Sequence, residues 1–78
     1  MSEKWKIAYE HQLDDGATLE VGDTFALRGE RGKRYRYIKT VHNIDRDDTW
    51  IDCYGGSRGG QQFRSIPSER LMGAEKKK

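Results

Sequence analysis

Cysteine, proline and long apolar runs are almost missing from this chain, and each absence narrows what the protein can be. The one cysteine, Cys53, cannot form a disulfide within the chain, which fits a reducing compartment. The one proline, Pro67, is expected to end a strand. No apolar run approaches the length of a membrane span, and the opening residues MSEKWK lack the apolar segment of a signal peptide. We therefore expect a cytoplasmic protein.

Residues that bind metals or carry out catalysis are also sparse. The two histidines, His11 and His42, lie far apart in sequence, and one cysteine cannot build a structural zinc site. The acidic run at residues 45–48 lacks the downstream glycine and glutamate of a calcium-binding EF-hand loop. Cys53 and His42 are a candidate nucleophile pair, but alternation places Cys53 beside Ile51 as a small core residue. The sequence predicts no metal, no cofactor and no enzymatic activity.

The composition lies between that of folded and disordered chains. Charged residues make up 36% of the 78 residues and hydrophobic residues 33%. This high charge and low hydrophobic content are typical of disordered chains. Two features favour folding: the apolar residues cluster in short alternating runs, and 10% of the chain is aromatic. A chain of this size buries only about 60% of its unfolded surface, so the core must be small. We expect one domain over residues 5–72, a flexible lead-in at residues 1–4 and a flexible basic tail at residues 73–78.

Short runs of β-forming residues, separated by turn signals, indicate an all-β fold. The expected strands cover residues 5–10, 18–21, 24–28, 34–42, 49–54 and 61–66. One 3₁₀ or α turn is expected from Pro67 to Arg70, with Leu71 and Met72 as a candidate last strand. This order of elements predicts a small SH3-like barrel of five to six short antiparallel strands.

The expected strand at residues 34–42 contains a conflict in its alternation. Tyr35, Tyr37 and Val41 share one face of the strand, but Lys39 falls on the same face. Either Lys39 extends to solvent at a sheet edge, or a β-bulge near Ile38 shifts the alternation.

Residues 28–39, RGERGKRYRYIK, combine the features that point most directly to a function. This segment carries a local charge of +5, in a chain whose net charge is only +2. Its glycines mark a hairpin loop, and cations on such a hairpin can neutralise phosphates. The predicted nucleic-acid-binding residues are Arg28, Arg31, Lys33, Arg34, Arg36, Lys39, Arg58 and Arg64. The alternative is that these cations only solvate edge strands and block aggregation.

Aromatic residues close to these cations suggest a stacking surface. Proteins that bind single strands stack bases on exposed rings beside cations, and the candidate platform here is Tyr35, Trp50 and Tyr54. The alternative is that the rings fill the core, as expected of a chain with few aliphatic residues, most strongly for Trp50 and Phe63. Residues 55–60, GGSRGG, are expected to form a loop, and the strand expected after it excludes a phosphate-binding loop. This loop either presents Arg58 to a partner or is a plain hairpin connection, and the plain connection is favoured.

Two resemblances support this interpretation. The segment VGDTFALRGERG at residues 21–32 resembles a KOW-type SH3 barrel module, which opens with a Gly-Asp turn, an alternating strand and a glycine-containing loop. The matching residues are Gly22, Asp23, Phe25, Leu27 and Gly29, with Gly32 matching if the loop is shortened. KOW modules occur in ribosomal and transcription proteins that touch RNA, so this resemblance implies nucleic acid. The pattern GERG, RYRYIKTVHN, TWIDCYGG and RSIPSERL resembles small uncharacterised proteins of actinobacterial phages, which implies fold and origin rather than mechanism.

The leading hypothesis is a small binding module that contacts phosphates of DNA or RNA through the basic hairpin. The alternative is a phage-encoded module that docks on an acidic surface of a host protein, since charge and sheet edges suit both partners. A third option is self-assembly with Trp50 and Tyr54 at the interface. A monomer and a small homo-oligomer both stay open, as does whether the strand at residues 5–10 joins its own barrel or another chain.

Overall fold

The computed structural model describes residues 4–30, 32–55 and 62–77, which form eight short strands and one 3₁₀ helix. The elements are β1 (Trp5–Ala8), β2 (Glu10–Gln12), β3 (Thr18–Glu20), β4 (Thr24–Ala26), β5 (Tyr35–Asn43), β6 (Asp48–Gly55), β7 (Phe63–Pro67), η1 (Ser68–Leu71) and β8 (Glu75–Lys77). Most of the expected lead-in, residues 1–3, lies outside the described residues.

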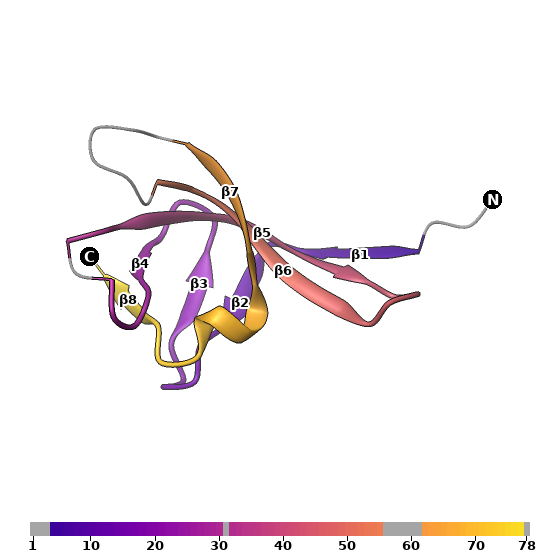
Figure 1. Cartoon of the computed structure of the whole chain (residues 1–78), viewed down its shortest axis with the longest axis horizontal. Helices are drawn as coiled ribbons and strands as arrows, with labels where there is room; N and C mark the ends of the chain where they lie inside the picture. The colour runs from indigo at the N-terminus through magenta and orange to yellow at the C-terminus, as the bar shows by residue number, and fades with distance from the viewer. Residues whose placement is uncertain (1–3, 31, 56–61, 78) are drawn as a thin grey trace.

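Six of these strands form one antiparallel sheet in the order β7-β6-β5-β4-β8, with β1 pairing to β5 beside this path. β2 and β3 form a separate hairpin. Figure 1 shows β2, β3, β4 and β8 below the long β5, while β1 and the far halves of β5 and β6 extend away to the right. The predicted all-β, small barrel-like domain with a 3₁₀ turn after Pro67 is confirmed. The described strands outnumber the expected ones because residues 5–12 split at a bend and the chain ends in a further strand.

Core side chains alternate with more exposed ones along β3, β4 and the first half of β5. The fully buried members of the core are Leu19, Phe25, Tyr37, Ile51 and Cys53. Ile51 and Cys53 lie on the inner face of β6, as their spacing predicts. Cys53 is fully buried, which confirms its expected place in the core, and burial raises the pKa of its thiol to about 11.

A β-bulge resolves the alternation conflict in β5. The register between β5 and β6 shifts between Tyr37, which pairs with Cys53, and Lys39, which pairs with Asp52. The bulge at Ile38 therefore leaves Tyr37 buried and turns Lys39 to the outer face, which confirms one of the two expected solutions. There the Lys39 Nζ lies 4.0 Å from a carboxylate oxygen of the buried Asp52.

The C-terminal residues join the sheet, in contrast to the flexible tail that their composition predicts. Residues 75–77 form β8, in which Lys76 pairs with Phe25 of β4, and the preceding Ala74 is buried. Lys76 also lies 3.2 Å from a carboxylate oxygen of Asp23. Residues 75–77 become a strand because β4 offers them an edge to pair with. Backbone hydrogen bonds across that edge do not require apolar side chains, so the composition of the segment does not reveal the strand. Leu71 and Met72 belong to η1 and the following turn instead of a strand.

The N-terminal strand pairs within its own chain. β1 runs antiparallel to the second half of β5, with Trp5 opposite Asn43 and Ile7 opposite Val41. The chain bends at Tyr9 before β2 begins. Within this chain the strand therefore joins its own sheet.

Candidate nucleic-acid interface

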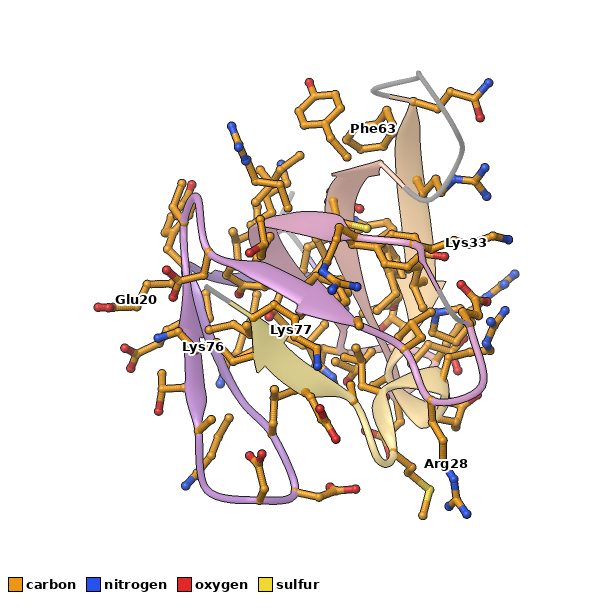
Figure 2. All side chains as sticks on the ribbon, turned by 90° about the vertical axis from the view of Figure 1, so that its left-hand side faces the viewer. Glu20, Arg28, Lys33, Phe63, Lys76 and Lys77 are labelled. Carbon is orange, nitrogen blue, oxygen red and sulfur yellow. The ribbon has the colours of Figure 1, made fainter. Side chains whose placement is uncertain are left out.

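The start of β5, the end of β6 and the start of β7 meet at one end of the sheet, which we call the basic end. Tyr35 pairs with Gly55 at this end, and Phe63 opens β7 opposite Tyr54. The exposed cations of the basic end that the structure describes are Lys33, Arg34 and Arg36. Figure 2 looks toward this part of the molecule, with Lys33 and Phe63 in the upper half of the view and Arg28 at the bottom.

Three side chains from three neighbouring strands form a row on the outer face of the basic end. Arg36 pairs with Tyr54, and Tyr54 pairs with Phe63. Directly paired residues project to the same face of an antiparallel sheet, so we call Arg36, Tyr54 and Phe63 the outer row. The rings of Tyr54 and Phe63 lie 5.7 Å apart at 77°, and these residues are 43% and 56% exposed. The outer row therefore offers two solvent-facing rings beside one cation.

The exposure of Phe63 contradicts its expected place in the core. Along β7, Ile66 is buried while Phe63 and Ser65 are exposed. The sequence of β7 indicates this exposure, because side chains alternate along a strand. Phe63 shares its face with the polar Ser65, and the aliphatic Ile66 lies on the opposite, inner face. The expectation was wrong because it rested on the scarcity of aliphatic residues and not on the parity of the strand.

Tyr35 does not belong to the exposed platform. It is only 3% exposed, and its ring stacks on Phe25 with centroids 5.4 Å apart. The Tyr35 hydroxyl donates a hydrogen bond to Oε1 of Glu30, whose Oε2 accepts one from Nη2 of Arg70 at 2.6 Å. Burial, followed by this hydrogen bond, raises the pKa of Tyr35 to about 12. Its face is therefore closed to a stacking base.

Trp50 lies away from the basic end, so the expected platform of three rings does not form. It is four residues from Tyr54 along β6, a separation of about 13 Å in an extended strand. Its ring contacts that of Trp5 edge to face, with centroids 5.4 Å apart. Trp50 is half-buried and is not part of the main core, so its expected core position is only partly met.

Sequence comparison now places the chain in a family. A family model described as a domain of unknown function, DUF7246, matches residues 1–78. The chain belongs to the DUF7246 family. Neither a curated protein nor a solved structure matches it.

The remaining predicted cations of this DUF7246 domain take up different roles. Lys39 is held beside Asp52. Arg64 is half-buried, and its Nε donates to the carbonyl oxygen of Gly55 at 2.9 Å. Arg64 thus braces the end of β6 next to Tyr54, and it acts as a positioning residue rather than a free cation. Arg28 is exposed but lies apart from Phe63 (Figure 2).

Two of the predicted binding residues, Arg31 and Arg58, lie outside the described residues of the DUF7246 domain. At the opposite end of β5, the turn at residues 44–47 and the start of β6 carry the acidic side chains of Asp45, Asp47 and Asp48. The nine residues of β5 separate the two ends by about 26 Å, more than the Debye length of about 8 Å at physiological salt. An anion at the basic end is therefore screened from these carboxylates.

The described residues provide neither a metal site nor a membrane-spanning helix. Among residues 4–30, 32–55 and 62–77, no three His, Cys, Asp or Glu side chains converge to hold a metal ion. No helix within those ranges is long and apolar enough to cross a membrane.

Proposed function

We propose that this protein binds single-stranded nucleic acid on the outer face of the basic end. Bases stack on Tyr54 and Phe63, and phosphates contact Lys33, Arg34 and Arg36. The observation that carries the proposal is the outer row, in which two exposed rings and an arginine lie in register on three adjacent strands. The KOW-like segment at residues 21–32 supports the same partner class, because such modules touch RNA.

The rings and the cations contribute in measurably different ways. Stacking of a base on an aromatic side chain is worth about 1–3 kcal/mol and tolerates any base. Each phosphate contact on a single strand adds about −0.7 to the slope of log affinity against log salt. Three such cations give a slope of about −2, so raising salt from about 50 mM to 200 mM should weaken binding about twentyfold.

Fluorescence anisotropy with labelled single-stranded oligonucleotides tests the proposal. The double variant Tyr54→Ala/Phe63→Ala should bind at least about thirtyfold more weakly than wild type, because two stacking contacts are lost. Met72→Ala is the matched control, since Met72 is also exposed and apolar but lies in the turn after η1.

Arg36→Glu should weaken binding and flatten the salt slope, whereas Arg46→Glu, at the acidic end, should do neither. Absence of binding to both DNA and RNA at about 50 mM salt refutes the proposal.

The alternative partner is an acidic surface of a host protein, which the exposed cations suit equally well. The ring pair favours nucleic acid. An acidic protein surface would be bound by the cations alone, whereas a nucleic acid also has bases that stack on the two exposed rings. A pull-down from lysate after nuclease treatment separates the two partner classes. Retention of one stoichiometric protein after that treatment would favour the protein partner.

A further inference from the structure

A small polar cavity lies beside the basic end, between β7 and the loop that joins β4 to β5. Its volume is about 160 Å³, and the residues that line it come from that loop, the start of β5, β7 and η1. Pockets that enclose whole small molecules span about 300–1,000 Å³. This cavity therefore has room for one chemical group and not for a complete nucleotide.

Cations outnumber acids in the lining of this cavity. Lys33, Arg64 and Arg70 stand against the one carboxylate of Glu30, so the described lining carries a net charge of +2. Both carboxylate oxygens of Glu30 already accept hydrogen bonds, one from the Tyr35 hydroxyl and one from Arg70. The charge that is left over is positive, and the cavity therefore suits a small anion.

Arg64 reaches the cavity already fixed in position. Its Nε donates to the carbonyl oxygen of Gly55 at 2.9 Å, and its Nη2 donates to Oε1 of Gln62 at 3.1 Å. These two bonds use two of the three guanidinium nitrogens. A guanidinium can bind two oxygens of one phosphate, and a side chain that is held in place before binding loses little freedom when it binds.

The cavity lies along the free edge of β7. Four consecutive residues of this strand, 64–67, line it, and because side chains alternate between the two faces, the cavity touches both faces and the edge between them. Among the described strands β7 pairs only with β6. The Gly55 N–H donates to the carbonyl oxygen of Gln62, and this pattern repeats every two residues. The backbone N–H of Ser65 therefore points away from β6 and adds a donor at this edge.

The outer row ends next to this cavity. Phe63, the last member of the outer row, stands on β7 directly before Arg64, whose side chain projects to the opposite face. A single strand that stacks on Tyr54 and then on Phe63 arrives at the edge of β7. The group that ends such a strand is then beside Arg64 and the mouth of the cavity.

We propose that the cavity binds the terminal phosphate of the single strand that stacks on the outer row. This inference rests on the proposed function and names the end group that the protein selects. A terminal phosphate carries a charge of about −1.5 to −2 at pH 7 and has three free oxygens. An internal phosphodiester has a sugar on each side, which a cavity of this size does not admit. A 5′ and a 3′ phosphate offer the same chemistry, and the polarity of the strand on the outer row decides which of them enters.

Competition measurements with unlabelled oligonucleotides test this inference on the full chain. Strands of one sequence carry a 5′ phosphate, a 3′ phosphate or hydroxyl groups at both ends, and each displaces the same labelled strand. One of the two phosphorylated strands should compete about tenfold better than the hydroxyl strand, because it adds hydrogen bonds between charged groups at the cavity. Equal competition by all three strands overturns the inference while the proposed function stands, whereas no binding of any strand overturns both.

Substitutions locate the selected phosphate at the cavity. Arg70→Gln removes a cation that lines the cavity but lies outside the outer row, and it should reduce the advantage of the phosphorylated strand to about twofold. Arg46→Gln is the matched control, because it makes the same change at an exposed residue of the turn before β6 and should leave the advantage unchanged. If Arg70→Gln lacks the circular dichroism of a folded chain, Lys33→Gln takes its place, since Lys33 is exposed in the loop before β5. An advantage that the cavity variant does not reduce, or that both phosphates confer equally, overturns the inference.

Discussion

Tyr35→Phe removes one hydroxyl from the core and leaves the surrounding packing in place. The ring of Tyr35 stacks on Phe25 at an interplanar angle of 23°, and phenylalanine can keep that contact. The substitution removes the hydrogen bond from the Tyr35 hydroxyl to Glu30. Glu30 keeps Arg70 as its second partner. The change therefore isolates one hydrogen bond to a charged group.

The expected loss follows from the surroundings of Glu30. Hydrogen bonds to charged groups contribute about 1.5–3 kcal/mol. The Glu30 side chain is 21% exposed and stays paired with Arg70, so solvent compensates part of the loss and we expect about 1.5 kcal/mol near neutral pH. For a domain of this size, the melting temperature should fall by roughly 6–12 °C.

The same bond makes the loss depend on pH. The hydrogen bond from Tyr35 lowers the pKa of Glu30 below 4.5, so this stabilisation is present above pH 4.5 and is lost as pH falls through the folded-state pKa. The pKa of Tyr35 is raised from 10.0 to about 12, so wild type loses stability as pH rises from 10 toward 12. The difference between Tyr35→Phe and wild type should shrink at both extremes.

Urea unfolding followed by tryptophan fluorescence, at acidic, neutral and alkaline pH, measures this difference. Tyr9→Phe is the matched control, because Tyr9 is exposed on the bend after β1. In a double-mutant cycle, Tyr35→Phe should cost far less in a Glu30→Gln background. A loss below about 0.5 kcal/mol at neutral pH, or a difference that is constant across pH, would refute the reasoning.

Two further predictions concern the ends of the sheet. Gly55→Ala should cost more than about 2 kcal/mol, because Gly55 has a φ of 115° and a Cβ there would overlap the Arg34 carbonyl oxygen. Gly16→Ala, also at positive φ but facing open space, should cost only about 1 kcal/mol, and equal losses in chemical unfolding would contradict the steric argument. A chain ending at Ala74 should lose about 2 kcal/mol or more, because it lacks β8 and the ion pair of Lys76. An unfolding midpoint equal to that of the full chain would contradict a structural role of β8.

Local alternation predicts the part of the fold in which each strand buries one face. Phe25 and Leu27 lie inside as their spacing indicates. The misplaced parity of Lys39 leaves two solutions, an edge lysine or a bulge, and the structure has the bulge at Ile38. β8 could not be predicted this way, because Glu75–Lys77 has no apolar alternation. Its strand conformation depends on the open edge of β4, which is a tertiary property.

The candidate site was predictable in its charge but only partly in its rings, because Tyr54 was expected on the stacking surface and Phe63 was not. The exposed Lys33, Arg34 and Arg36 come from the charged run that marks the segment. Phe63 was missed, although its parity with Ser65 places it on the outer face beside Tyr54. The pairing of Arg36 with Tyr54 depends on the register between β5 and β6, which the bulge changes and which no local pattern specifies.

The most direct test of the proposed interface is a chemical-shift titration of the isotope-labelled chain with a short single-stranded oligonucleotide. At about 50 mM salt, a condition that favours phosphate contacts, the largest amide shifts should occur at Arg36, Tyr54 and Phe63. The indole N–H signals of Trp5 and Trp50, which pack on each other away from the basic end, should stay in place. Shifts confined to these two tryptophans, or no shifts at saturating oligonucleotide, would contradict a nucleic-acid interface at the basic end.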